Sequence, residues 1–362
     1  MSVKFKKVLL DKSNKCEACS VADFDRDGNL EIMCGEYIYY GKNFDQKRKI
    51  CEITYDGDYV HDFSNYPIDV NGDGWLDIIT GSWWSEGLYW RENPKNSTDE
   101  WKTHKICGLS NVETIRYFDI DGDGTDEIFP NTPCEPQSFF KLVKDSDGKP
   151  TGEMKKYVIG GTKDAGHGLG FGDINGDGKV DILLCDGWLE QPEDVYSSDW
   201  IFHPDYNIPA ASVPMICHDI NGDGLNDIIV GAGHNYGLWW LEQTIVDGKR
   251  GFIKHEIEMT HSQYHDMQLL DIDGDGKLEL VTGARHNAHN GNDPGEKDPI
   301  GTYIFKLEGT QFTQYTLDLG MPDTASGTGI YFWIADLTGN GKLDLVLPGK
   351  EGLYIFYNEC EI

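Results

Sequence analysis

Basic residues are scarce in this chain. Its 362 residues include 31 Lys and Arg against 62 Asp and Glu, which gives a formal net charge of −31. A net charge of this sign repels the phosphates of nucleic acids and the headgroups of anionic membranes. We therefore expect neither a nucleic-acid partner nor a membrane partner.

Long apolar runs are also missing, since no stretch of about twenty apolar residues occurs that could span a bilayer. The N-terminal segment MSVKFKKVLLDKSNK lacks an apolar core of the length that a secretory signal needs. The nine Cys are scattered, and the CxxC of Cys16 and Cys19 has no second pair at zinc-finger spacing. These absences favour a reducing, cytoplasmic location, with secretion as the alternative if a leader has been removed.

Common catalytic signatures are absent as well. The Gly-rich segment GAGHNYG follows a strand pattern without opening a helix, so it does not predict a phosphate-binding loop. No nucleophile elbow is visible either. Any chemistry must therefore come from residues that the fold brings together.

One loop pattern is present seven times: an acid at position one, Asp, Asn or Thr at position three, Asp or Asn at position five, Gly at position six and an acid at position nine. The copies are DFDRDGNLE, DVNGDGWLD, DIDGDGTDE, DINGDGKVD, DINGDGLND, DIDGDGKLE and DLTGNGKLD, and their starts lie 46 to 65 residues apart. A period in this range indicates a repeat architecture and is typical of a propeller blade.

The oxygen atoms of this loop suit a hard cation. Carboxylates at positions one, three, five and nine, with a Gly that permits the tight turn, are typical of a Ca²⁺ site. An EF-hand differs because it closes with Glu at position twelve between two helices. The seventh copy has neutral Thr338 and Asn340, so weaker binding is expected there. The predicted ligands are Asp23, Asp25, Asp27, Glu31, Asp69, Asn71, Asp73, Asp77, Asp119, Asp121, Asp123, Glu127, Asp173, Asn175, Asp177, Asp181, Asp219, Asn221, Asp223, Asp227, Asp271, Asp273, Asp275, Glu279, Asp336 and Asp344.

Strand-like segments flank each loop and set the architecture. Runs rich in Ile, Leu and Val precede and follow the loop, which indicates two strands, and two further strands complete each unit. The last unit stops after its third strand, GLYIFYN, and the N-terminal segment VKFKKVLL can supply the fourth. Such pairing leaves no open edge. The sequence thus predicts an all-β fold, a seven-bladed β-propeller with a Ca²⁺-binding loop in each blade, closed by the N-terminal strand and forming a single domain over residues 1–362.

Histidines gather at one rim of the predicted ring. Residues just before a first strand, or just after a second strand, should surround the channel mouth opposite the metal loops. The six histidines at such positions are His61, His167, His234, His265, His286 and His289. Imidazole is a proton shuttle near neutral pH and a ligand for transition metals. By contrast, His104 and His255 are predicted to be structural, His218 is predicted to brace a loop, and His203 is left open.

The repeated ADxDxDGxxDIxxG pattern resembles that of the FG-GAP/VCBS repeat β-propellers over essentially the whole chain. The segments VPMICHDINGDGLNDIIVGAGHNYGLWWLEQ and YHDMQLLDIDGDGKLELVTGARHNAHNGNDPGEKDP are similar to a narrower group, that of the propeller domain of aldos-2-ulose dehydratase-like sugar lyases. This second resemblance implies the elimination of water from a keto-sugar. The repeat itself is specific for a fold and not for a function.

We therefore expect a carbon–oxygen lyase that performs β-elimination on an oxidised sugar, either a keto-sugar or a uronic sugar. The reaction needs a base, an acid and a group that holds the developing enolate oxygen. The imidazoles would act as base or metal ligands, Tyr236 would deliver a proton, and Arg285 would hold the oxyanion. The predicted catalytic residues are His167, His234, Tyr236, His265, Arg285 and His289. The predicted substrate-binding residues are Trp83, Trp84, Trp188, Asn235, Asn290 and Asp293.

Two other functions remain open at this point. One is a non-catalytic, Ca²⁺-stabilised propeller that binds carbohydrate or protein. The other is a hydrolase that uses Asp62 or Glu113 with a second acid. The expected cofactors are several structural Ca²⁺ ions, and a divalent transition metal or Mg²⁺ at the His-rich rim is a further option. The expected partner is a small sugar or glycoside, and the sequence leaves the sugar and the oligomeric state open.

Overall fold

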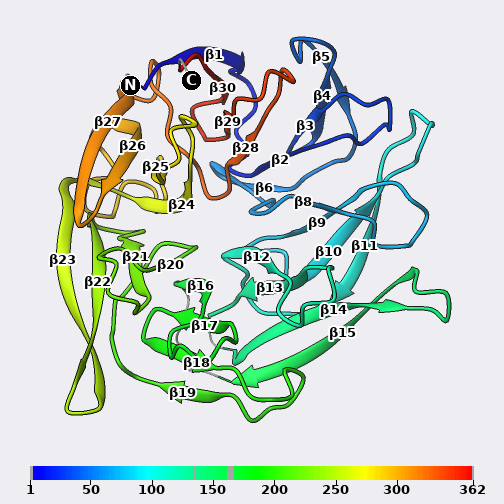
Figure 1. Ribbon diagram of the computed structural model, residues 1–362. Helices are drawn as coiled ribbons and strands as arrows, with labels where there is room; N and C mark the ends of the chain where they lie inside the picture. The colour runs from blue at the N-terminus through cyan, green and yellow to red at the C-terminus, as the bar shows by residue number, and fades with distance from the viewer. Residues whose placement is uncertain (1–2, 134, 161–166, 361–362) are drawn as a thin grey trace.

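The apolar segments around each acidic loop form the first two strands of a sheet in the computed structural model, which describes residues 3–133, 135–160 and 167–360 (Figure 1). Seven sheets of four antiparallel strands are arranged in a ring around a central axis. The prediction of an all-β, seven-bladed propeller is therefore confirmed. Its predicted Ca²⁺ ions remain a prediction.

Each blade is numbered by the acidic loop that it carries. Blade 1 contains β2 (Cys19–Ala22), β3 (Glu31–Cys34), β4 (Tyr37–Tyr40) and β5 (Gln46–Lys49). Blade 2 contains β8 (Tyr66–Ile68), β9 (Asp77–Gly81), β10 (Leu88–Glu92) and β11 (Lys102–Cys107). Blade 3 contains β12 (Thr114–Phe118), β13 (Glu127–Asn131), β14 (Gln137–Lys144) and β15 (Pro150–Gly160).

The second half of the ring repeats this plan. Blade 4 contains β16 (Leu169–Gly172), β17 (Asp181–Leu184), β18 (Gly187–Glu190) and β19 (Ile201–His203). Blade 5 contains β20 (Ile216–His218), β21 (Asp227–Gly231), β22 (Tyr236–Val246) and β23 (Lys249–Ser262). Blade 6 contains β24 (Tyr264–Leu270), β25 (Glu279–Ala284), β26 (Ile300–Glu308) and β27 (Gln311–Gly320). Blade 7 contains β28 (Trp333–Ala335), β29 (Asp344–Leu347), β30 (Leu353–Asn358) and the N-terminal β1 (Phe5–Asp11).

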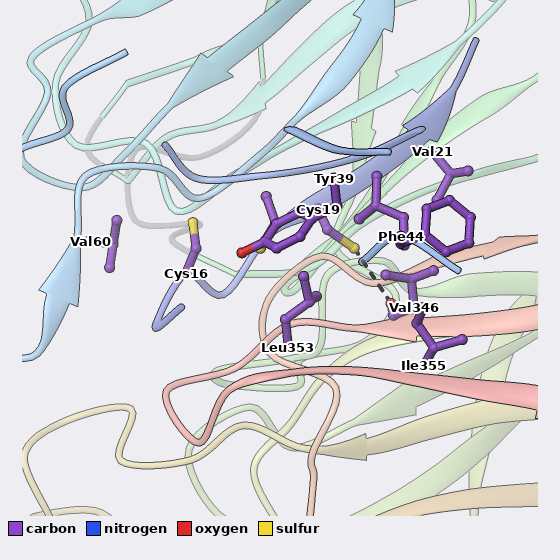
Figure 2. Close-up of a cluster of buried hydrophobic side chains, with 11 residues drawn as sticks. Cys16, Cys19, Val21, Tyr39, Phe44, Val60, Val346, Leu353 and Ile355 are labelled. Atoms are coloured by element: carbon purple, nitrogen blue, oxygen red, sulfur yellow. Dashed lines mark hydrogen bonds between the residues drawn. The ribbon is translucent and has the colours of Figure 1, made fainter. Parts of the chain in front are cut away.

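The ring closes through β1, as the sequence predicted. Strand β1 pairs antiparallel with β30, in a register that runs from Phe5 opposite Asn358 to Asp11 opposite Leu353. Figure 2 shows the apolar cluster that seals this junction, where Cys19 of blade 1 packs with Val346 of blade 7. The Cys19 thiol donates a hydrogen bond to the Val346 carbonyl, with 3.5 Å between sulfur and oxygen.

The outer strands of three blades share a Trp–His–Glu arrangement. The rings of Trp90, Trp188 and Trp240 stack on His104, His203 and His255, with centroids 4.4, 4.2 and 4.5 Å apart. Each of these imidazoles contacts a Glu of the same blade through Nε2 at 2.7 Å. The structure therefore accounts for His104 and His255 as packing residues and assigns His203 to the same role.

Three further features complete the fold. A short hairpin, β6 (Tyr55–Asp56) with β7 (Tyr59–Val60), lies between blades 1 and 2 and was not predicted. The eight described cysteines are all free thiols. Within the described residues, no helix has the length and apolar character needed to cross a membrane.

Candidate functional site

Four histidines from three blades meet at the channel mouth opposite the acidic loops, and we call them the imidazole cluster: His167, His234, His265 and His289. His167 precedes β16, His234 lies between β21 and β22, His265 is in β24, and His289 follows β25. Ring centroids lie 4.5 Å apart for His167 and His234, and 4.9 Å apart for His234 and His265. The His234 and His289 rings stack at 4.1 Å. The structure thus brings these four sequence-predicted residues together.

Hydrogen bonds of the Nδ1 atoms fix the tautomers of two imidazoles, His167 and His234. Nδ1 of His167 lies 3.0 Å from the Ala211 carbonyl oxygen, and Nδ1 of His234 lies 2.6 Å from a carboxylate oxygen of Asp293. Both oxygens are acceptors, so each Nδ1 must carry the proton and each Nε2 must carry a lone pair. Yet the two Nε2 atoms face each other at 2.8 Å. A shared proton or a cation is needed to hold two lone pairs this close.

The arrangement is the one that metal-ligating histidines adopt, in which the second ring nitrogen donates to a carbonyl or a carboxylate. His265 follows the same pattern, since its Nδ1 lies 3.3 Å from the Gln263 carbonyl oxygen. With metal–nitrogen distances of about 2.0–2.1 Å, a tetrahedral ion would set two ligand nitrogens about 3.3 Å apart. The facing Nε2 atoms of His167 and His234 need to separate by only about half an ångström to admit such an ion.

Asp293 extends this donor set. One of its oxygens contacts Nδ1 of both His234 and His289, the latter at 2.9 Å. His234, His289 and Asp293 each offer one ligand atom, all within 4.8 Å of one another. The residues present therefore fit a divalent transition metal between the facing Nε2 atoms of His167 and His234, with Asp293 as the outer hydrogen-bond partner of His234.

Burial keeps the deep imidazoles neutral. Burial lowers the pKa of His265 well below its ordinary value, and the nearby Arg285 charge lowers it further. Burial also lowers the pKa of His167 and of His234, and neighbouring imidazoles and Arg285 add to the effect on His234. Neutral imidazoles are the form that binds metal.

Arg285 lies beside the cluster with its charge already compensated. Its side chain is buried, and its Nε donates to Glu17 at 2.9 Å. Its Nη1 lies 3.4 Å from Glu113 and donates to Nε2 of His265 at 3.3 Å. The sequence assigned Arg285 to an oxyanion. In the structure two carboxylates hold its guanidinium beside His265, and the oxyanion role stays a prediction.

Three buried charged residues were either not predicted as part of the site or have a role that differs from the predicted one. They are Glu17, Arg116 and Asp62. Glu17 was not predicted, although its place before β2 follows the same rim rule as the histidines. Arg116 was also not predicted, and it joins the innermost strands of blades 3 and 6 by donating to Asp266 at 2.8 Å. Asp62 is fully buried beside Arg91, which removes it as a glycosidase acid.

The other predicted site residues differ in how they lie relative to the imidazole cluster. Tyr236 contacts the same segment between β25 and β26 that carries His289, since its ring is beside Gly295 and its hydroxyl donates to Asp298. Its predicted role as the proton donor stays a prediction. Asn235 and Asn290 are exposed near the cluster, each in a turn that follows a second strand.

The three predicted sugar-stacking tryptophans separate into two groups. Trp83 and Trp84 lie in the turn after β9, and the Trp84 ring stacks on His61 with centroids 5.3 Å apart. Trp83 and Trp84 also line a surface pocket of about 640 Å³. Trp188 is 0% exposed and lies within β18, with its Nε1 donating to Asp205. The prediction for Trp188 is wrong, because a ring sealed in the core cannot stack on a sugar.

The acidic loops keep the shape that the sequence implied. In loop one, the Asp23 carboxylate accepts the backbone N–H groups of Asp27 and Gly28, both at 3.1 Å. Asp23, Asp25 and Asp27 each offer a ligand oxygen within 4.8 Å of the others. This loop opens onto a cavity of about 910 Å³.

The acid at position nine divides the loops into two kinds. Where it is Asp, both oxygens accept backbone N–H groups, as in Asp77 with Val70 and Asn93 at 2.9 and 2.8 Å. Asp181, Asp227 and Asp344 repeat this pattern. These bonds brace the four loops, and the ligand role that the sequence predicted for these acids stays a prediction, since each carboxylate oxygen keeps a second lone pair.

Comparisons with known proteins agree with the fold. The FG-GAP-like repeat family matches residues 69–129 and 219–282. Integrin alpha pat-2 of Caenorhabditis elegans and its Caenorhabditis briggsae counterpart are each 24% identical over 260 residues, which covers 56% of this chain and 20% of those proteins. This chain thus matches about a fifth of the length of these relatives.

Solved structures add the shape of the whole ring. A crystal structure of BBS1N in complex with ARL6DN, soaked with lead, matches with a TM-score of 0.57 at 8% identity and covers 99% of this chain and 98% of that one. The mercury-soaked form gives 0.53 at 10% identity, with 99% and 97% coverage. At such identities the likeness concerns the fold alone. The chain is a seven-bladed β-propeller in which two segments, residues 69–129 and 219–282, match the FG-GAP-like repeat family.

Proposed function

We propose that this propeller is a metal-assisted carbon–oxygen lyase, which eliminates water or an alcohol from an oxidised sugar at the imidazole cluster. The observation that carries the proposal is the pair of Nε2 atoms of His167 and His234, which face each other at 2.8 Å while both Nδ1 atoms donate to oxygen. A bound divalent ion would polarise the carbonyl or carboxylate oxygen next to the carbon that loses its proton.

The base in this proposal is His289. Its side chain is 53% exposed, so it is the member of the cluster that a sugar can reach, and its Nδ1 is 2.9 Å from Asp293. Asp293 orients the ring and stabilises the charge that forms when Nε2 takes the proton. The electron pair of the broken C–H bond forms the new carbon–carbon double bond, and the oxygen on the β carbon leaves and takes a proton from solvent.

The assay follows the ultraviolet absorbance of the conjugated product. We expect the metal-loaded protein to raise this absorbance with a keto-sugar or a uronide. His289→Ala should lower kcat by about 100- to 10,000-fold, the usual contribution of a general base. His255→Ala is the matched control, because His255 lies on an outer strand against Glu242. Full turnover by His289→Ala, or no turnover by the metal-loaded protein with both substrate classes, would contradict the proposal.

The second candidate is a non-catalytic binding propeller. The likeness to integrin alpha proteins favours it, as does the pocket lined by Trp83 and Trp84. Glycan or protein binding in this case would be independent of a transition metal and unaffected by His289→Ala. It would be weakened by Trp83→Ala, so the two variants separate the two functions.

A further inference from the structure

The seven loops differ at one position outside the loop, on the third strand of each blade. In blade 6, Glu279 at loop position nine pairs across the sheet with Lys306. In blade 3, Ile128 pairs with Phe140, which sets Glu127 opposite Lys141. These two blades therefore place a lysine beside the acidic loop.

Each lysine extends its ammonium group into the acidic cage. Nζ of Lys141 lies 2.9 Å from Asp123 and 2.7 Å from Glu127, and it also donates to Asp121. An ammonium group has three donors, and here three carboxylates of the cage receive them. Burial would lower the pKa of Lys141, but these hydrogen-bonded carboxylates outweigh it and raise that pKa.

The sixth loop has the same arrangement. Nζ of Lys306 lies 3.1 Å from Asp273 and 3.6 Å from Glu279, and it also donates to Asp275. Lys306 is 8% exposed, so its charge is largely removed from water. A buried ammonium is stable only when it is paired, and the loop acids are its partners.

Blades 2, 4 and 5 place the opposite charge at this position. The residue across from the ninth loop position is Glu92, Glu190 or Glu242, as the strand registers show. Glu242 lies over its loop, since Asn221 donates to it at 3.3 Å. The loops of these blades have Asn at position three, whereas loops three and six have Asp121 and Asp273 there. An Asn at loop position three thus occurs together with a Glu on the third strand, and an Asp at that position in loops three and six occurs together with a Lys.

In loops one, three and six, three acids each offer a ligand atom within 4.8 Å of the others, and in loops three and six a lysine already contacts these acids. The carboxylates that would approach Ca²⁺ to about 2.3–2.6 Å in loops three and six are the ones that hold the lysines. A Ca²⁺ ion and an ammonium group cannot share one cage, because both need the same oxygens and repel each other. In blades 2, 4 and 5 the third-strand position offers a Glu oxygen, and Lys95 and Lys179 each contact a single acid of loops two and four, Asp73 at 3.1 Å and Asp177 at 3.8 Å.

We propose that Lys141 and Lys306 are built-in counterions that replace the divalent cation in loops three and six. Loops one, two, four and five, which have no lysine opposite the ninth loop position, then remain open to a divalent cation, and in loops two, four and five the third-strand Glu is an additional ligand. The sequence predicted Ca²⁺ in loops three and six, and the lysines remove the need for it. The ring keeps two of its blades independent of the Ca²⁺ concentration.

The test counts bound Ca²⁺ by equilibrium dialysis at saturating Ca²⁺, after prior removal of metals with a chelator. Lys306→Met keeps the length of the side chain and removes its charge, so this variant should bind one more Ca²⁺ per chain than the natural protein. Lys141→Met should do the same. Lys277→Met is the matched control, because Lys277 lies in the same sixth loop but pairs with the exposed Glu308. Its Ca²⁺ count should equal that of the natural protein.

Folded Lys141→Met and Lys306→Met proteins that bind no extra Ca²⁺ would overturn the proposal. If a variant does not fold, crystals of the natural protein grown with Ca²⁺ give the same decision. Ions should then occupy loops one, two, four and five, and the lysine ammonium groups should occupy loops three and six. An ion between Asp271 and Asp275 of the natural protein would overturn the proposal directly.

Discussion

The tautomers of the imidazole cluster are set by the hydrogen-bond acceptors of the Nδ1 atoms. The carbonyl of Ala211 and the carboxylate of Asp293 leave the Nε2 lone pairs of His167 and His234 pointing at each other. The sequence predicted the four imidazoles of the cluster because each falls at the end of a strand. It could not predict their tautomers, because these depend on acceptors from other segments of the chain.

Burial also gives different roles to residues of the same type, as the predicted sugar-stacking tryptophans show. Trp188 was predicted to stack on sugar, but the turn between β17 and β18 is so short that Trp188 falls in the third strand. The turn between β9 and β10 is longer, and it carries Trp83 and Trp84 to the surface. Turn length is the feature that the sequence pattern left undetermined.

This difference predicts unequal effects on stability. Trp188→Ala should lower the free energy of unfolding by about 3–5 kcal/mol, because it opens a cavity in the core and removes the ring contact with His203. Trp83→Ala should cost much less, since its ring is only partly buried. Urea unfolding followed by circular dichroism measures both variants. Equal losses in the two variants would contradict the assignment of Trp188 to the core.

Glu351 gives a prediction about pH. Burial raises the pKa of this carboxyl group to about 7 from an ordinary value of 4.5. The folded state therefore keeps the proton that the unfolded state has released, and the folded state loses stability as pH rises from 4.5 to about 7. Glu351→Gln should raise the free energy of unfolding by up to about 3 kcal/mol at pH 8 and change it little at pH 4.

The matched control for this effect is Glu193→Gln, whose side chain is 93% exposed. It should change the free energy of unfolding by less than about 0.5 kcal/mol at both pH values. Chemical unfolding at the two pH values gives the comparison. A gain for Glu351→Gln that is the same at pH 4 and pH 8 would show that the carboxyl group does not titrate as described.

At the scale of strands, the sequence predicted the fold well because the repeated loop marks where each blade begins. The acidic loop separates the first two strands, and the missing fourth strand of the last unit identified β1 as the closing element. The β6–β7 hairpin was missed because it carries no repeat signal. The Lys and Glu residues on the third strands were visible in the sequence, but only the sheet register shows that they lie beside the loops.

Strand β1 gives a prediction about closure. Deleting residues 1–11 removes the partner of β30 and exposes an edge strand, which invites pairing with another molecule. We expect the melting temperature to fall by more than about 5 °C and the apparent mass to rise in gel filtration. Leu9→Ser is the control, since this side chain is 47% exposed and should leave both measurements unchanged. A truncated protein with unchanged melting temperature and mass would contradict closure by β1.

At the scale of the whole molecule, the two faces of the propeller carry different functional groups. The loop face holds carboxylates, with a lysine beside them in blades 3 and 6 and a third-strand glutamate in blades 2, 4 and 5. The opposite channel mouth gathers imidazoles from blades 4, 5 and 6, with Arg285 held by Glu17 from blade 1. Only a closed ring brings residues as distant in sequence as Glu17 and Arg285 into contact, and the site therefore depends on closure.

The central claim is that the imidazole cluster holds a divalent transition metal, and a Zn²⁺ titration at saturating Ca²⁺ tests it most directly. The natural protein should bind one Zn²⁺ per chain, and His167→Ala and His234→Ala should lose it. Asp293→Asn should weaken binding by about 10- to 100-fold, as expected when an outer hydrogen-bond partner is changed. His255→Ala should bind as the natural protein does. If the natural protein binds no Zn²⁺, or if His234→Ala binds it as tightly as His255→Ala does, the account of the channel mouth is wrong.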